Sequence, residues 1–163
     1  MLYTDGVSNQ AGCGAGIILT DPEGIESSHC FRFEFNATNN EVEYEALLVG
    51  MKVAKELSAN FFFVRSDSQL VINQVSGQYQ AMGENMVAYL EKVQEAMTSF
   101  KGVKMDQIPR DENRRADVLA KIVSTGGQAL PKRVPFQLIP RSSIAREREV
   151  NPVDRLPYWM DPK

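Results

Sequence analysis

The chain has 163 residues, of which 43% are hydrophobic and 24% charged, and its formal net charge is −3. This length suits one domain with a buried core, and the composition excludes a disordered chain and a fibrous protein. No apolar run approaches the roughly 20 residues of a membrane-spanning helix, and the N-terminus lacks a secretory signal, so no membrane partner is expected. Cys13 and Cys30 match no metal-ligand spacing. We therefore expect reduced cysteines in an intracellular protein, cytoplasmic or nuclear and not secreted.

Charge is distributed unevenly along the chain. Residues 1–124 carry 11 Lys/Arg against 17 Asp/Glu, a charge of −6, whereas residues 125–163 carry 7 against 4, a charge of +3. An acidic body argues against a protein that holds nucleic acid by bulk electrostatics. It remains compatible with a protein that meets phosphate groups through bound metal ions.

Strands and tight turns account for the first 35 residues. A first strand is expected to start at residues 2–4 and to break at Asp5-Gly6, and residues 14–20 and 25–35 predict a second and a third strand. Because the turns between them are short, the pattern predicts an antiparallel meander.

Helices and strands alternate after this meander. Helices are expected at residues 40–57, 68–75, 84–100 and 113–123, and strands at residues 61–64 and 103–108. The segment 61–64 (FFFV) is too apolar for exposure on one side, which favours a sheet covered on both faces. The order of elements therefore predicts an α/β domain with a mixed, five-stranded sheet and helices on both of its faces.

The composition changes after Thr125. Six of the eight prolines lie in residues 126–163, in an Arg-rich sequence without a helical or strand period. We therefore expect one folded domain at residues 1–124, followed by a linker or extended tail at residues 125–163.

Two acidic residues follow predicted strands. Asp5 stands where the first strand is expected to end, and for this residue alone an ordinary Asp-Gly turn is the simpler interpretation. Asp67 closes the strand at residues 61–64 and opens the next helix, where it would serve as an N-cap, although Ser66 or Ser68 would also do so. Since open α/β sheets bind ligands at the carboxyl ends of their strands, Asp67 is also a candidate for a functional site.

Glu43 lies on the core-facing stripe of the first helix. At 100° per residue it shares that stripe with Leu47 and Met51, whereas Glu41 and Glu45 are expected on the opposite, solvent side. An unpaired carboxylate is costly to bury. An interaction with the helix dipole would explain an acid in the first turn, but Glu41 offers that interaction from the wet face, so the inward position of Glu43 indicates a function.

Asp117 lies in the second turn of the last predicted helix, where an ordinary solvated acid is the simpler interpretation. The four acids together stand at strand ends or helix starts of one sheet, and the sequence places no cationic partner beside them. Clustered acids raise each other's pKa, so they persist at low cost only around a cation. Oxygen ligands alone favour Mg²⁺ or Mn²⁺, and two such ions roughly 4 Å apart support phosphoryl displacement. The spacing leaves open whether the four residues converge.

Four motifs carry a resemblance to a known family. They are YTDGVSN at residues 3–9, ATNNEVEYEAL at 37–47, SDSQLV at 66–71 and IPRDENRRAD at 108–117. Over residues 2–124 the sequence resembles type I ribonuclease H, and more narrowly the ribonuclease H domain of plant gypsy-like long-terminal-repeat retroelement polyproteins. The resemblance implies a ribonuclease H-like sheet in the order 3-2-1-4-5 and an enzyme that hydrolyses the RNA strand of RNA–DNA hybrids by two-metal catalysis with Mg²⁺, which Mn²⁺ would replace. It places the catalytic, metal-binding acids at Asp5, Glu43, Asp67 and Asp117.

The resemblance also implies contacts with the substrate. Asn9, Asn39 and Gln69 match positions that touch the minor groove and the ribose 2′-hydroxyls, which distinguish RNA from DNA. Thr38 matches a position that holds a phosphate of the DNA strand. Ordinary roles are also open, since Asn9 suits a turn and Thr38 or Asn39 suits a helix N-cap. Arg110 occupies the loop where many relatives carry a histidine that helps the product leave, so it is a candidate catalytic residue.

The same resemblance implies partners, and two alternative functions stay open. Residues 156–162 (LPYWMDP) resemble the segment between ribonuclease H and integrase, which implies reverse transcriptase and integrase segments of one polyprotein as partners. One alternative is a catalytically silent module that binds hybrids or acts as a tether, and the presence of all four acids argues against it. Another is DNA cleavage or strand transfer on the same fold, against which the residues 38–40 favour the ribonuclease.

Overall fold

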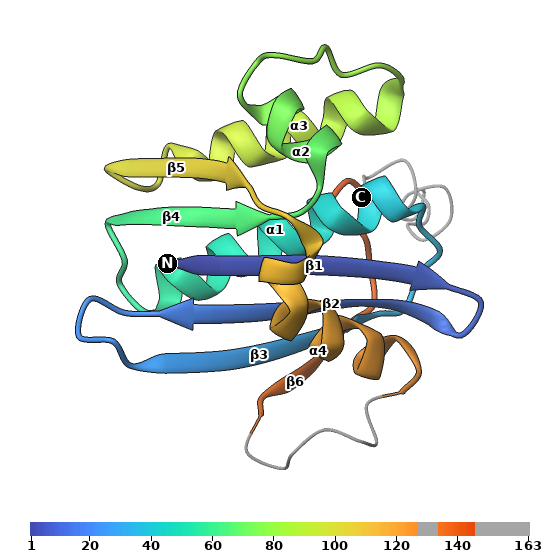
Figure 1. Ribbon diagram of the computed structural model, residues 1–163. Coiled ribbons are helices and arrows are strands. Elements are labelled where there is room, and N and C mark those ends of the chain that lie inside the picture. Colours follow the sequence, from blue (N-terminus) through green and yellow to red (C-terminus); the bar gives the residue numbers. More distant parts are fainter. Residues whose placement is uncertain (127–133, 146–163) are drawn as a thin grey trace, which may run out of the picture.

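The computed structural model describes residues 1–126 and 134–145 (Figure 1). The predicted resemblance at residues 156–162 lies outside these residues. The elements, in chain order, are β1 (Leu2–Asn9), β2 (Gly12–Thr20), β3 (Glu26–Phe33), α1 (Asn39–Glu56), β4 (Phe61–Ser66), α2 (Gln69–Val75), α3 (Glu84–Met97), β5 (Gly102–Gln107), a short 3-10 helix η1 (Arg110–Asn113), α4 (Arg114–Ser124) and β6 (Phe136–Ile139). None of the helices in the described residues is long and apolar enough to cross a membrane.

The strands form one mixed sheet in the order β5-β4-β1-β2-β3-β6. β1, β2 and β3 are antiparallel neighbours, whereas β4 lies parallel to β1 and β5 parallel to β4. The predicted order 3-2-1-4-5 is confirmed. The predicted number of strands was wrong, because β6 adds a sixth strand parallel to β3. β6 is short and mostly exposed, so backbone pairing holds it there and its sequence shows no strand period.

Helices cover the two faces of the sheet unequally. α1 packs on β1 and β2 with α3 beside it, and α4 packs on β1, β2 and β3 from the opposite face (Figure 1). The main core lies between the sheet and α1, where Leu2, Ile17, Leu47 and Val64 are almost completely buried. The helices thus sandwich the central strands of the sheet.

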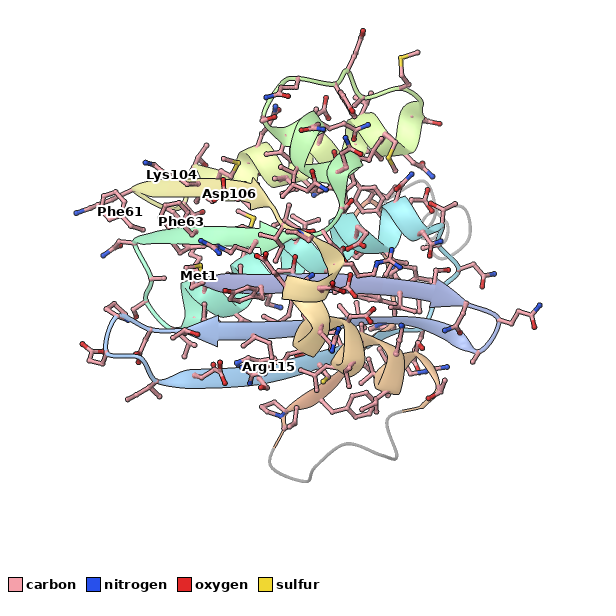
Figure 2. All side chains as sticks on the ribbon, viewed as in Figure 1. Met1, Phe61, Phe63, Lys104, Asp106 and Arg115 are labelled. Atoms are coloured by element: carbon pink, nitrogen blue, oxygen red, sulfur yellow. The ribbon has the colours of Figure 1, made fainter. Side chains whose placement is uncertain are left out.

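The outer side of β4 is open to solvent. Phe62 and Val64 are buried, but Phe61 is 70% and Phe63 42% exposed, because α4 covers β1–β3 and leaves this part of the sheet uncovered (Figure 2). The Nζ of Lys104 lies 5.8 Å from the centre of the Phe63 ring. The expectation that the segment 61–64 is buried on both faces was therefore wrong.

Candidate active site

Asp5 lies in the middle of β1. The strand continues through Asp5 to Asn9, because Asp5 pairs with Gly16 of β2 and Gly6 pairs with Ala15. The expected break at Asp5-Gly6 was wrong, and so was the interpretation of Asp5 as a turn residue. Asp5 is only 3% exposed to solvent. A buried acid in a central strand needs a partner that an ordinary turn acid does not need.

Glu43 is fixed to the same strand from the first helix. The backbone of α1 passes so close to β1 that a Cβ atom on Gly6 would lie 2.6 Å from the carbonyl oxygen of Val42. Glycine at this position lets the two elements meet, and the N–H of Gly6 donates a hydrogen bond of 3.0 Å to Oε1 of Glu43. Glu43 thus points inward, as its helical stripe predicted.

Asp67 follows the last residue of β4, which runs parallel to β1. The N-cap of α2 is Ser68, whose Oγ accepts a hydrogen bond from the N–H of Val71 at 3.3 Å. The capping role considered for Asp67 is therefore filled by its neighbour. The carboxylate of Asp67 is 8% exposed and faces the other acids.

Three carboxylates converge at this point of the sheet. One oxygen each of Asp5, Glu43 and Asp67 lies within 4.8 Å of the other two. Asp117 of α4 is outside this tight group but lines the same cleft, and its carboxyl group contributes to the raised pKa of Asp5. Its side chain is 18% exposed, so it is not an ordinary solvated acid. All four acids line one cleft of about 370 Å³, whose wall consists of Asp5, Gly6, Val7, Asn39, Asn40, Glu43, Asp67, Ser68, Gln69, Leu70, Arg110, Asp117 and Lys121.

Burial and mutual repulsion alter the protonation of these acids. Burial, followed by the nearby charge of Glu43, raises the pKa of Asp5. Burial and then the charge of Asp67 raise the pKa of Glu43 to about 8. Burial also raises the pKa of Asp67, although Arg110 opposes this. For Asp117 burial acts upward as well, but hydrogen bonds with Asp5 and Lys121 hold the pKa below its ordinary value. Groups of this kind release their protons readily only when a cation enters.

Two cations lie beside the acids, contrary to the expectation from the sequence. Nε of Arg110 is 3.7 Å from Oδ2 of Asp67, and Nζ of Lys121 is 3.0 Å from Oδ2 of Asp117. The side chains of Arg110 and Lys121 are 84% and 62% exposed, so each pair contributes little stability. Lys121 was missed, although its spacing of four residues from Asp117 on one helix is a usable signal.

A comparison with known families identifies this arrangement. A model of the family described as "Reverse transcriptase-like" matches residues 3–123, which include all four acids. The chain belongs to the reverse transcriptase-like family.

Known members and structures agree with this assignment. Ribonuclease HI of Halobacterium salinarum is 30% identical over 120 residues, which cover 72% of this chain and 60% of that protein. The crystal structure of RNase H1 from the same organism has a TM-score of 0.66 at 29% identity and covers 74% of this chain and 93% of that chain. LC11-RNase H1, solved in complex with an RNA/DNA hybrid, has a TM-score of 0.63 at 28% identity and covers 74% of this chain and 92% of that chain. The fold of this reverse transcriptase-like domain is therefore that of ribonuclease H, as predicted. The chain spans less than two thirds of the full length of the Halobacterium protein.

Two of the four polar residues expected to touch substrate line the cleft that holds the acids of this reverse transcriptase-like domain, and two do not. Asn39 and Gln69 line the acidic cleft. Thr38 is the N-cap of α1, where it forms a capping box with Glu41, and it lines a neighbouring hollow. Asn9 does not line the cleft: its Oδ1 accepts hydrogen bonds in a turn and its Nδ2 donates to Ser124 Oγ at 3.1 Å. The ordinary roles considered for Thr38 and Asn9 are thus present.

The raised pKa values of the acids predict how the stability of the metal-free protein depends on pH. The folded protein holds protons on Asp5, Glu43 and Asp67 more tightly than the unfolded chain does, so their contribution to stability is fully present below their ordinary pKa values, 3.8 and 4.5. It is lost as the pH rises through the folded values. Asp117 shifts in the opposite direction and titrates below this range.

We therefore expect the Tm of the metal-free protein to fall as the pH rises from about 5 to about 10, the pKa of Asp5 in the folded protein, and Mg²⁺ or Mn²⁺ to restore it at the alkaline end. Calorimetry with and without a chelator measures both effects. Glu45 adds to the fall in the same direction, because burial raises its pKa too, but added metal would not reverse its part. A Tm that stays constant over this range, or a metal effect confined to acid pH, would contradict the electrostatic description of the site.

Proposed function

We propose that this domain is a ribonuclease H that hydrolyses the RNA strand of RNA–DNA hybrids, with Asp5, Glu43, Asp67 and Asp117 as its catalytic acids. The observation that carries the proposal is the convergence of three carboxylate oxygens within 4.8 Å, with Asp117 adjoining, in an open cleft. Support comes from the relative named ribonuclease HI in Halobacterium salinarum and from the structural likeness to LC11-RNase H1 in complex with an RNA/DNA hybrid.

The donor set fits Mg²⁺, with Mn²⁺ as a substitute. All candidate ligands in the cluster are carboxylate oxygens, and hard divalent cations prefer such ligands. The pKa values of Asp5 and Glu43 are raised because the charge of these buried groups is not compensated, and a divalent ion would compensate it. Two bound ions would supply an activated nucleophile and stabilise the leaving oxygen of a phosphodiester.

The residues of the chain position the acids and the substrate. The N–H of Gly6 fixes the carboxylate of Glu43, so that β1 and α1 present their acids in one orientation. Asn39 and Gln69 reach the cleft from the first turns of α1 and α2, and we propose that their amides contact the ribose 2′-hydroxyls of the RNA strand. For Thr38 we propose contact with a phosphate of the DNA strand, and for Asn9 contact with the minor groove.

The wider setting we propose is a retroelement polyprotein that also contains reverse transcriptase and integrase segments. The family description, "Reverse transcriptase-like", supports this setting. So does the charge of the domain: residues 1–124 carry −6, and between Gln69 and Phe100 the only cation is Lys92. A domain with few phosphate contacts binds hybrids weakly, and a covalent link to a hybrid-binding partner raises its effective concentration.

Cleavage of labelled substrates tests the proposed function. We expect the protein with Mg²⁺ to cut the RNA strand of an RNA–DNA hybrid, to leave single-stranded RNA and duplex DNA intact, and to stop in the presence of a chelator. Binding of the hybrid without cleavage would favour the silent tether module instead. Cleavage of duplex DNA would favour the DNA-cutting or strand-transfer alternative.

Arg110 is expected to act on turnover more than on binding. Its guanidinium lies 3.7 Å from Asp67 at the mouth of the cleft and is 84% exposed, where it meets the developing charge or the departing product. Arg110→Ala should therefore lower the multiple-turnover rate by about tenfold or more and change the Kd for hybrid by less than about threefold. Single- and multiple-turnover rates, together with the Kd across a salt series, make the comparison. If Arg110→Ala leaves turnover unchanged and only flattens the salt dependence, Arg110 is a phosphate contact alone.

A further inference from the structure

The described chain continues beyond the residues that the family model matches. The family model ends at residue 123, yet the described residues 134–145 pack against the domain. β6 pairs with β3 over four residues, and two further backbone hydrogen bonds join the same strands, from Cys30 N–H to the carbonyl of Pro135 at 2.9 Å and from Glu34 N–H to that of Ile139 at 2.8 Å. Ile139 and Ile144 are partly buried against the main core.

Residues 134–145 meet α1, the helix that carries Glu43, at Glu45. The residue is completely buried, so the expectation that it faces solvent was wrong. Its Oε2 accepts hydrogen bonds from the Tyr89 hydroxyl at 2.6 Å and from the N–H of Ser143 at 2.8 Å, and its Oε1 accepts one from the Ser143 hydroxyl at 2.6 Å. Within residues 1–126 and 134–145, no Lys, Arg or His forms an ion pair with Glu45.

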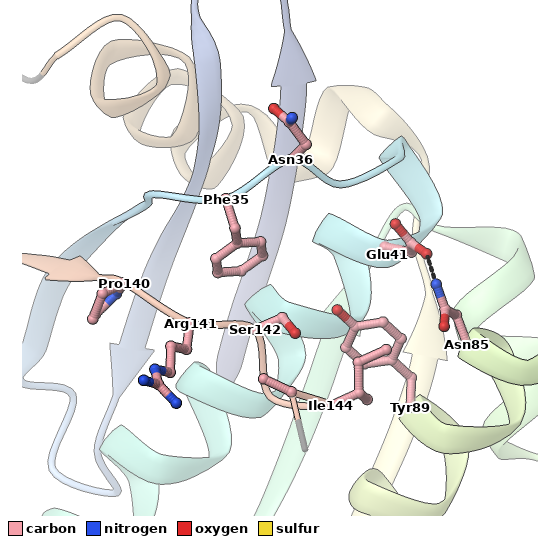
Figure 3. Close-up of a pocket in the computed structure, with 10 residues that line it drawn as sticks. Phe35, Asn36, Glu41, Asn85, Tyr89, Pro140, Arg141, Ser142 and Ile144 are labelled. Carbon is pink, nitrogen blue, oxygen red and sulfur yellow. Dashed lines mark hydrogen bonds between the residues drawn. The ribbon is translucent and has the colours of Figure 1, made fainter. Parts of the chain in front are cut away.

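These partners come from two separate parts of the chain. Tyr89 lies on α3, where its ring stacks on Tyr44 of α1 with ring centres 5.4 Å apart. Figure 3 shows the chain from Pro140 to Ile144 passing beside α1 towards Tyr89. Residues of this segment and Tyr89 line a hollow of about 450 Å³. Two of the three hydrogen bonds to Glu45 are made by Ser143, so α3 alone leaves most of this carboxylate without a donor.

A buried carboxylate without a cation is costly unless hydrogen bonds replace its hydration. Glu45 is thus stable in its place only while residues 140–145 lie over it. It is also two residues from Glu43, on the side of α1 that faces away from Gly6. Contacts on both sides of the helix then define where Glu43 stands relative to β1.

We infer that residues 136–145 form a clasp, held by the bonds of Ser143 to Glu45, that completes the domain and makes Glu45 a positioning residue for the catalytic helix. The folded unit then extends to residue 145 rather than to residue 124. The clasp itself does not depend on the reaction, whereas its effect on Glu43 rests on the proposed function.

Hydrogen exchange in the full chain tests the clasp. In Glu45→Ala the amide of Ser143 loses its acceptor, and we expect it to exchange at least about tenfold faster than in the parent, with faster exchange of Glu34 N–H, which bonds to Ile139. Ser143→Ala, which removes only the hydroxyl, should give a smaller change of the same kind. Glu91→Gln, an exposed acid on α3, serves as the control and should change nothing. An unchanged exchange rate at residue 143 in Glu45→Ala would overturn the clasp.

Metal binding tests the positioning role without reference to cleavage. Titration calorimetry with Mn²⁺ should show affinity several-fold weaker in Glu45→Ala, whereas Glu45→Gln, which keeps an acceptor for the N–H of Ser143, should restore most of it. If Glu45→Ala binds Mn²⁺ as tightly as the parent, the positioning role is overturned. The hydrogen-exchange experiment then decides alone whether the clasp exists. If the parent does not cut hybrids but both measurements behave as expected, the proposed function fails and the inference stands.

Discussion

Asp67→Asn is expected to abolish most of the hybrid cleavage while the protein stays folded. The substitution keeps the shape of the side chain but removes one of the three charges that converge within 4.8 Å. Loss of a single group that stabilises the transition-state charge typically costs about 10²- to 10³-fold in rate, and we expect a loss of at least this size. Steady-state cleavage at saturating Mg²⁺ measures the rate, and metal titration shows whether affinity falls with it.

The stability of this variant should move in the opposite direction from its activity. Burial and the charge of Asp117 raise the pKa of Asp67, so its ionised form destabilises the metal-free fold at neutral pH, and asparagine removes that repulsion. The pair with Arg110 is lost, but it is exposed on the arginine side and contributes little. We therefore expect Asp67→Asn to unfold at an equal or slightly higher urea concentration in chelator.

The matched control is Glu91→Gln, the same type of change at an exposed site on α3. Glu45 does not serve this purpose, because it is buried and hydrogen-bonded. Equal losses of activity in Asp67→Asn and Glu91→Gln, or a variant at position 67 that cuts like the parent, would remove Asp67 from the catalytic group.

Gly16→Ala, which adds a single methyl group, is expected to cause a large loss of stability. α4 lies directly on β2, and a Cβ atom on Gly16 would stand 2.2 Å from the carbonyl oxygen of Ala116 and 2.8 Å from Cβ of Leu119. Backbone atoms cannot rotate away as a flexible side chain does, so the whole helix must shift. Overpacking of this kind costs about 3 kcal/mol, which is a large part of the stability of a small domain.

The same substitution should weaken metal binding at the proposed site. Gly16 pairs with Asp5 across the strands, and α4 carries Asp117, which lines the same cleft as Asp5. A helix pushed off the sheet separates these two acids. Urea unfolding gives the loss of stability, and Mn²⁺ titration of the folded variant gives the loss of affinity.

Gly77→Ala is the control for this prediction. Gly77 has a φ of 88°, but nothing lies within 4 Å of the position of its Cβ, so only backbone strain of about 1 kcal/mol is expected. If Gly16→Ala costs no more than Gly77→Ala, then α4 adapts freely to the sheet and its position does not define the site.

The sequence determined the type and order of the elements as far as α4, and it singled out the four acids that the structure brings together in one cleft. Helical and strand periods depend on neighbouring residues, so α1, α2, α3 and α4 begin and end within a few residues of the predicted positions. The inward direction of Glu43 followed from the same local period. The order of the first five strands came from the resemblance over residues 2–124, and the structure confirms it.

Only the tertiary structure decided which faces are covered. α1 is packed between the sheet on one side and α3 with residues 140–145 on the other, so it lacks the fully wet face that a single apolar stripe predicts, and Glu45 is buried. In β4 the reverse holds, because α4 stops over β1–β3 and leaves Phe61 and Phe63 exposed. Burial depends on what packs against an element from distant parts of the chain, and the period within that element carries no record of it.

Long-range pairing decided the remaining features. Asp5 lies within a strand because β2 continues to pair with β1 past Gly6, and β6 exists because β3 offers a free edge. Arg110 and Lys121 reach the acids only because η1 and α4 fold across β1. Each of these positions is fixed by backbone hydrogen bonds or contacts between segments far apart in the sequence, and local propensity does not encode such contacts.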